Sequence, residues 1–230
     1  MKRVISEGII YKLIKYSDDS AIAICFLRDF GKTKIFINKA FSKKRGVNKF
    51  FPAEIDFLRK DESDLHKLYG IKYDTSKGYF LENPQIFLRL NIVFNIIDLL
   101  YHDDEPDEIL YKYILNINEK NMTKWTVYTI NYILKIQGLL KNYDVCGECG
   151  CSLEEIVLVN GDFLCEKCSG KNPFLNKTRT EILNKVFLPE YKSVKISKED
   201  EIYIVKFLTK YVQTIIGKEI KGVDLLEELI

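Results

Sequence analysis

Along residues 1–80, apolar and polar positions alternate with the period of two that is typical of β-strands. The pattern predicts five short strands around Ile9–Leu13, Ala21–Leu27, Ile35–Ile37, Ile55–Phe57 and Tyr69–Tyr73. Polar turn signals separate them, such as the run Ser17–Ser20. Five strands of this length predict an oligonucleotide-binding (OB) barrel, and an SH3-like barrel fits the same pattern.

After Gly78 the spacing of apolar residues becomes helical. Asn83 and Pro84 can open a helix that continues to about residue 100, and a second helix begins near Pro106. Further helices are expected at 123–140, 178–187, after Ser197 and from about 223. The expected fold class is α+β, with an OB-like domain at residues 1–80 and a helical domain at 81–230.

Four cysteines interrupt the helical pattern with the spacing Cys146-x2-Cys149-x15-Cys165-x2-Cys168. Two such pairs can supply four thiolates to one tetrahedral zinc ion, so the sequence predicts a zinc ribbon at residues 144–170. With every ligand position filled by Cys, one structural Zn²⁺ per chain is expected rather than a catalytic one.

Two other interpretations of these cysteines remain open. Cys151 lies two residues after Cys149 and could replace it as a ligand. A disulfide pair or a thioredoxin-like redox motif also uses Cys-x2-Cys spacing, although an expected cytoplasmic location favours zinc. The sixth cysteine, Cys25, lies in an apolar run and is expected to be a buried small residue.

The net charge of +2 is unevenly distributed. Residues 1–80 carry 17 Lys and Arg against 10 Asp and Glu, a net +7, whereas residues 81–230 carry 18 against 23, a net −5. The segment 32–49 has no acidic residue, and its seven cations are candidate DNA contacts: Lys32, Lys34, Lys39, Lys43, Lys44, Arg45 and Lys49. A solvated lysine-rich loop is the alternative interpretation.

Four aromatic residues, Phe36, Phe41, Phe50 and Phe51, lie in or beside this segment. Exposed aromatic rings can stack on the bases of single-stranded DNA without reading sequence. Aromatic residues of a small barrel are more often part of its core, so we favour burial for each of them.

Several function classes lack support in the sequence. No phosphate-binding loop, dinucleotide-binding glycine motif, His-Glu-x-x-His motif or nucleophile elbow occurs, which argues against an enzyme. The two histidines are expected in a surface loop or strand start (His66) and at a helix end (His102). The acidic run 103–105 is interpreted as a solvated helix terminus that serves the start of the next helix, rather than as a divalent-cation site. The longest apolar stretch is too short for a membrane span, and no secretory signal is recognisable, so we expect a cytoplasmic location.

The order of modules resembles that of the bacterial DNA repair and recombination protein family RecO. The opening run Ser6–Lys12 is similar to the first strand of that family, and Phe30-Gly31-Lys32 with the basic segment behind it is similar to its strand, glycine and basic loop. Near the end, Phe207-Leu208 and Ile216–Lys221 match the C-terminal helix junction, and the four cysteines match the zinc-bearing members. The chain departs from the family at Ala40, at 221–224 and in the extra Cys151.

The resemblance implies a non-enzymatic recombination mediator of the bacterial nucleoid. Such a protein binds single- and double-stranded DNA, anneals complementary strands coated by single-strand-binding protein (SSB), and acts with RecR to load RecA. Its expected partners are therefore DNA, RecR and the C-terminal tail of SSB, with no membrane. An alternative is a zinc-ribbon and OB binding module of the transcription or translation machinery without annealing activity.

Overall fold

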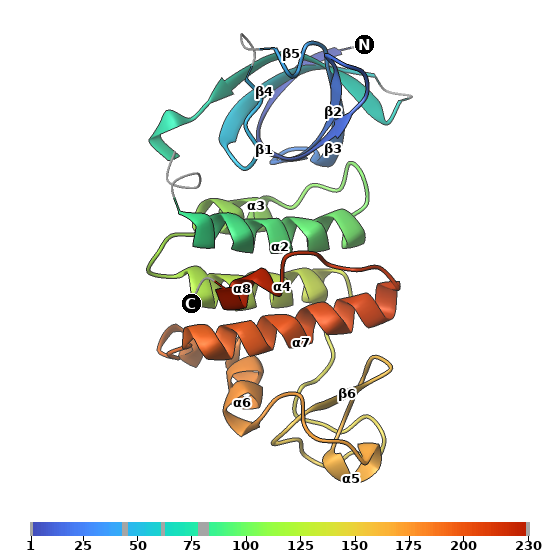
Figure 1. Cartoon of the computed structure of the whole chain (residues 1–230), viewed down its shortest axis with the longest axis vertical. Coiled ribbons are helices and arrows are strands. Elements are labelled where there is room, and N and C mark those ends of the chain that lie inside the picture. The colour runs from blue at the N-terminus through green and yellow to red at the C-terminus, as the bar shows by residue number, and fades with distance from the viewer. Residues whose placement is uncertain (1, 43–45, 61–62, 78–82, 229–230) are drawn as a thin grey trace. The chain divides into compact units, whose positions relative to one another are not determined.

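The computed structural model describes residues 2–42, 46–60, 63–77 and 83–228, which separate into two compact units (Figure 1). The barrel unit comprises Met1–Phe94 and Leu100–Ile117. The helical unit comprises Asn95–Leu99 and Asn118–Ile230. The expected domain boundary between residues 80 and 81 lies outside the described residues.

Five strands close into a barrel in the order β1-β2-β3-β5-β4. They are β1 (Lys2–Lys15), β2 (Ala21–Leu27), β3 (Gly31–Ile37), β4 (Pro52–Arg59) and β5 (Leu65–Tyr73). β1 pairs with β2 and β4, and the parallel pairing of β3 with β5 completes the ring. The expected five-stranded OB-like barrel is confirmed.

The alternation in the sequence determines which side chains enter the barrel. On β3 the inward residues Ile35 and Ile37 are fully buried, and Lys34 and Phe36, which alternate with them, face outward. Small inward residues of β2, such as Ala23 and Cys25, leave room for the larger Phe57 of β4. Cys25 is therefore the buried small residue that the sequence predicts.

Two helices complete the barrel unit. α2 (Pro84–Leu100) begins where the Asn83 side chain accepts the backbone N–H of Gln85, and α3 (Glu108–Leu115) is capped by Asp107. Phe94 of α2 stacks on Tyr11 of β1, with ring centroids 4.7 Å apart. α2 therefore covers part of the outer surface of β1, and Tyr101, directly after α2, covers Phe26 of β2.

The helical unit is built around α4 (Met122–Ile136) and α7 (Lys198–Ile216), with α6 (Lys177–Lys185) and α8 (Leu225–Glu228) beside them. Short 3-10 turns lie at Thr75–Lys77 in the barrel unit and at Pro189–Lys192 here. The Ser197 hydroxyl caps α7 by accepting the Asp200 N–H and donating to its carboxylate, as the sequence predicts.

The cysteine module lies between α4 and α6 and contains a two-stranded hairpin, β6 (Val157–Val159) and β7 (Asp162–Leu164), followed by α5 (Glu166–Ser169). Asn160 and Gly161 form its turn, both with positive φ, as a two-residue hairpin requires. Within the described residues, no helix is both long enough and apolar enough to span a membrane.

Gly31, at the start of β3, permits a close approach of two segments of the barrel unit. Its φ is +64°, and a Cβ there would lie 1.9 Å from the carbonyl oxygen of Glu105. We expect Gly31→Ala to lower the free energy of unfolding by at least about 2 kcal/mol, because strained backbone and a steric clash add together. Chemical denaturation measures the effect.

Gly46→Ala is the matched control, because a Cβ at Gly46 meets no atom within 4 Å. Its stability should stay within about 0.5 kcal/mol of the unmodified protein. Equal stability of the Gly31 and Gly46 variants would contradict the close approach.

Candidate nucleic-acid interface and metal centre

The basic segment begins on the outer face of β3. Lys32 and Lys34 alternate with inward residues there, whereas Lys39 follows the strand with φ +55° and is exposed. Lys49 is exposed just before β4, with its Nζ 5.8 Å from the centre of the Phe50 ring. The predicted contacts Lys43, Lys44 and Arg45 lie outside the described residues.

An acidic segment of the same unit, residues 103–105, contacts these cations. Asp103 forms ion pairs with Lys34 and with Lys32, the latter at 3.5 Å. Asp104 lies 3.5 Å from Arg59, and its backbone N–H donates to the carbonyl oxygen of Lys32 at 2.9 Å. Partial burial raises the pKa of Asp103, but the two ammonium groups outweigh it, so the net shift is downward.

Residues 103 and 104 of this acidic run are exposed, as expected of a solvated segment, but they do not serve the start of the next helix. α3 begins only at Glu108, and Asp107 supplies its cap by accepting the N–H of Leu110 at 2.8 Å. Residues 103 and 104 instead neutralise charge on the barrel, because their side chains reach β3 and the end of β4. This pairing joins residues 69 positions apart in sequence, which no local pattern reveals.

The aromatic candidates divide into buried and accessible groups. Phe50 and Phe51 are 1% and 9% exposed, and Phe50 packs against Phe94 and Phe87 in the core of the barrel unit. Phe41 is exposed, and Phe36 is half-buried on the outer face of β3. The preference for burial is correct for the first two and wrong for Phe41.

His66 lies at a strand start, one of its two expected positions, and is buried inside the barrel rather than exposed in a surface loop. It is the second residue of β5, where its ring stacks on Phe57 at 5.6 Å. Its Nδ1 accepts the backbone N–H of Lys60, which gives the imidazole a structural partner. Packing and this hydrogen bond account for the buried position of His66, and no catalytic role is needed to explain it.

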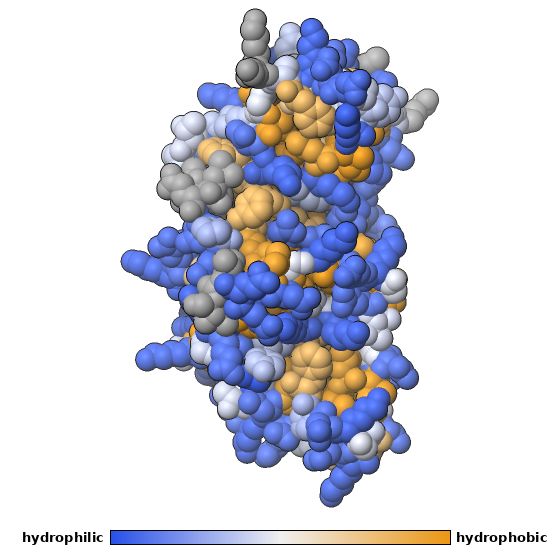
Figure 2. All heavy atoms as spheres, in the orientation of Figure 1, coloured by the Kyte–Doolittle hydropathy of each residue, from blue (hydrophilic) through white to orange (hydrophobic). Residues whose placement is uncertain are grey.

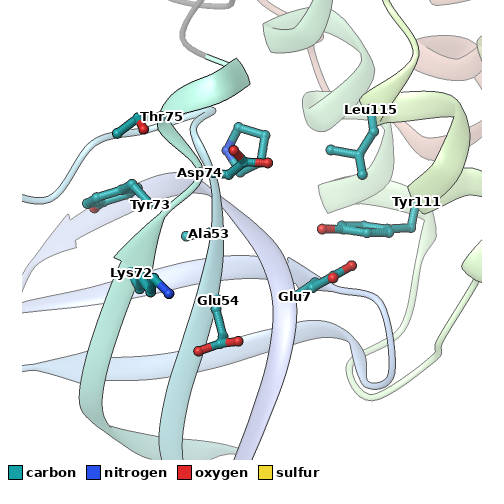
Figure 3. A pocket seen from close by; sticks show the side chains of 10 residues that line it. Glu7, Ala53, Glu54, Lys72, Tyr73, Asp74, Thr75, Tyr111 and Leu115 are labelled. Atoms are coloured by element: carbon teal, nitrogen blue, oxygen red, sulfur yellow. The ribbon is translucent and has the colours of Figure 1, made fainter.

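A cavity of about 410 Å³ lies against the barrel strands and α3 within the barrel unit (Figure 3). Tyr111 of α3 faces it, and burial raises the pKa of the phenol, which the nearby Glu7 carboxylate reinforces. The charged groups around it are three carboxylates and one ammonium. Its lining is Glu7, Pro52, Ala53, Glu54, Lys72, Tyr73, Asp74, Thr75, Tyr111 and Leu115. This acidic lining does not suit a DNA phosphate.

The four predicted cysteines come together in the helical unit. Each of Cys146, Cys149, Cys165 and Cys168 offers a sulfur, and all four sulfurs lie within 4.8 Å of one another. The sulfurs of Cys149 and Cys165 are 3.9 Å apart. Four thiolates bound tetrahedrally at about 2.3 Å from a zinc ion would be about 3.8 Å apart, so the donor set and its spacing fit that metal.

Local backbone geometry aims the sulfurs at one point. Gly150 and Gly170 have φ of +70° and +63°, which lets the chain fold back after each cysteine pair. Backbone N–H groups of Cys149 and Cys165 lower the pKa of the Cys146 thiol to about 6. Hydrogen bonds of this kind favour the thiolate that a metal needs.

Aromatic packing fixes the cysteine module to the helices. Phe163 of β7 stacks on Tyr143 at 5.4 Å and contacts the rings of Phe207 and Tyr211 on α7 at 5.3 and 5.0 Å. The Tyr143 hydroxyl donates to the buried Asn131 side chain of α4. Because Cys165 directly follows β7, the position of the second cysteine pair depends on this aromatic cluster.

Comparison with known proteins supports the resemblance to RecO. No protein-family model matches the chain. The DNA repair protein RecO of Syntrophus aciditrophicus (strain SB) is 24% identical, over 97% of this chain and 95% of that protein. The DNA repair protein RecO of Pelodictyon phaeoclathratiforme (strain DSM 5477 / BU-1) is 24% identical, over 62% of this chain and 60% of that protein. The similarity to RecO inferred from the sequence motifs is thus confirmed.

Proposed function

We propose that this chain is a recombination mediator in DNA repair. It binds single- and double-stranded DNA, anneals complementary strands coated by SSB, and acts with RecR to load RecA. The observation that carries the proposal is the similarity to a DNA repair protein RecO over 97% of the chain. The mediator performs no covalent chemistry, and its place is the bacterial cytoplasm, in association with the nucleoid.

The physics of the barrel supports DNA binding. Seven cations lie within eighteen consecutive positions that contain no carboxylate, and phosphate contacts by such groups release counterions from DNA. Lys39 and Lys49 are exposed at the two ends of the part of this segment that follows β3. Binding through phosphates does not depend on base sequence, as annealing of arbitrary complementary strands requires.

Annealing of two complementary labelled oligonucleotides coated with the cognate SSB tests the function directly. We expect this protein to accelerate annealing without nucleotide hydrolysis, and the acceleration should fall as salt rises. A variant with alanine at Lys39, Lys43, Lys44 and Arg45 should bind DNA more weakly and with a flatter salt dependence.

Two outcomes would contradict this account. Unchanged binding by the quadruple variant would remove these residues from the interface. Folded, metal-loaded protein that does not accelerate annealing would instead favour the alternative, a zinc-ribbon and OB binding module of the transcription or translation machinery.

The ion pairs of Asp103 lead to a separate prediction. Its carboxylate forms ion pairs with Lys32 and Lys34, the two cations of the basic segment that lie on β3. We expect Asp103→Asn to tighten single-stranded DNA binding by about threefold, because a carboxylate that pairs with two lysine ammonium groups and repels phosphates is lost. The slope of log affinity against log salt should steepen by about one.

Glu219→Gln removes one exposed carboxylate from the helical unit and is the matched control. Its affinity for DNA should equal that of the unmodified protein. Weaker or unchanged binding by the Asp103 variant, with its stability intact, would show that Lys32 and Lys34 lie outside the DNA interface.

The cysteine cluster holds one structural Zn²⁺ per chain in this proposal. Cys146, Cys149, Cys165 and Cys168 are its ligands, and four thiolates leave no coordination position for substrate. When bound, the metal ties the two cysteine pairs together and stabilises the module that carries Phe163. Its binding free energy then contributes to folding.

Cys165→Ser tests the metal site. We expect the variant to lose zinc and to unfold at a lower temperature, because one of four thiolates is missing and Phe163 loses its fixed position against α7. Metal analysis and thermal unfolding followed by near-ultraviolet circular dichroism measure the two effects.

Cys151→Ser is the control, since Cys151 is not one of the four clustered cysteines, although its thiol lies beside those of Cys149 and Cys165. It should keep both the metal and the stability. Loss of zinc from this variant, with retention by Cys149→Ser, would instead make Cys151 the ligand.

A further inference from the structure

The barrel carries a row of apolar side chains on the outer face of β1, β2 and β3. Ile14 lies opposite Ile22, and Ile22 lies opposite Phe36. Residues directly opposite in neighbouring strands point to the same side of a sheet. Since Ile35 and Ile37 fill the barrel core, Phe36 between them points away from it. Figure 2 shows that apolar residues reach the surface among hydrophilic ones.

Tyr16 extends this row just beyond the end of β1. Its ring meets the Phe36 ring edge to face, with centroids 5.5 Å apart and planes at 85°. The Tyr16 backbone N–H donates to the carbonyl oxygen of Ser20, which holds the start of the turn. Tyr16 is nevertheless 67% exposed, so most of its ring surface is open to a ligand.

Lysines flank the aromatic pair on the same face. In the parallel pairing of β3 with β5, Lys67 lies beside Phe36. One row further along, Lys12 and Lys34 lie on either side of Ile24. Two nearby carboxylates are already in ion pairs, Asp18 with Lys15 and Asp103 with Lys34.

We propose that Tyr16 and Phe36 form a base-stacking site for single-stranded DNA, with Lys12 and Lys67 beside it facing the phosphates. The site rests on the proposed DNA-binding function and gives it a structural preference for single strands. Bases of a single strand offer their faces to aromatic rings, whereas bases of a duplex are stacked on one another. The open ring with cations beside it matches the alternation of base and phosphate along a single strand.

The site contains Phe36, one of the four aromatic candidates from the sequence, together with Tyr16, which was not among them. Phe50 and Phe51, next to the basic segment, are buried and closed to bases. Phe41 is 51% exposed, and among the described residues it makes no ring contact comparable to the Tyr16–Phe36 pair. Phe41 is therefore the rival position that an experiment has to separate from Tyr16.

The test is binding of a fluorescent fifteen-nucleotide oligo-dT, of a base-free oligonucleotide of equal length and of a duplex, over a range of salt. Tyr16→Ala should bind oligo-dT about tenfold more weakly, because stacking on this ring is lost. Its binding to the duplex and to the base-free strand should not change, and the salt slope should stay the same, because no phosphate contact is removed.

Four further variants complete the test. Tyr16→Phe should keep the affinity for oligo-dT, and Tyr16→Trp should keep it while its fluorescence is quenched on binding. Phe41→Ala and Tyr203→Ala, which remove exposed rings from the basic segment and from α7, should bind as the unmodified protein does.

Unchanged oligo-dT binding by Tyr16→Ala, or a loss confined to Phe41→Ala, would overturn the stacking site while the proposed function stands. Equal loss of duplex and single-strand binding by Tyr16→Ala would also overturn it, because stacking would not be the cause. If the unmodified protein binds neither form of DNA, the proposed function itself fails.

Discussion

Closure of the five-stranded ring is the constraint that decides how the barrel unit uses its side chains. The interior accepts only one residue in two along each strand, and inward residues such as Ala23 and Ile35 occupy it. Each residue between them has to face outward. There, Phe26 is covered by Tyr101, whereas Phe36 remains accessible beside Tyr16. The outer face is thus divided between a part that packs against other segments of the unit and a part that stays accessible.

Positive charge on this outer face is partly neutralised by the acidic residues Asp103 and Asp104. Asp103 and Asp104 reach the barrel because Gly31 lets the chain at Glu105 approach β3 closely. Lys32 and Lys34 consequently face the carboxylate of Asp103, whereas Lys39 and Lys49 of the segment after β3 are exposed. In the proposed function, phosphate binding by the basic segment is combined with base stacking on the outer face of the first strands, which suits a protein that handles strands without reading their sequence.

The sequence predicted the features that depend on local periodicity. The five strands, the long helices and the Ser197 cap follow from spacing and capping chemistry, and the four clustered cysteines follow from metal-ligand spacing. The dipeptide Asn160-Gly161 is typical of a two-residue hairpin turn, but no hairpin was predicted from it. Contacts between distant segments left no such signal. Neither the pairing of Asp103 with Lys34 nor the burial of His66 can be inferred from neighbours in the chain.

In the proposed function, the barrel unit holds single-stranded DNA on the outer face of its first three strands and on the basic segment that follows β3. Photo-crosslinking of the full chain to an oligonucleotide that carries 5-iodouracil, followed by peptide mass spectrometry, locates the contact directly. The account predicts cross-linked peptides from residues 2–60, with Tyr16 among the modified residues. Cross-links confined to residues 118–228 on DNA-bound protein would contradict it.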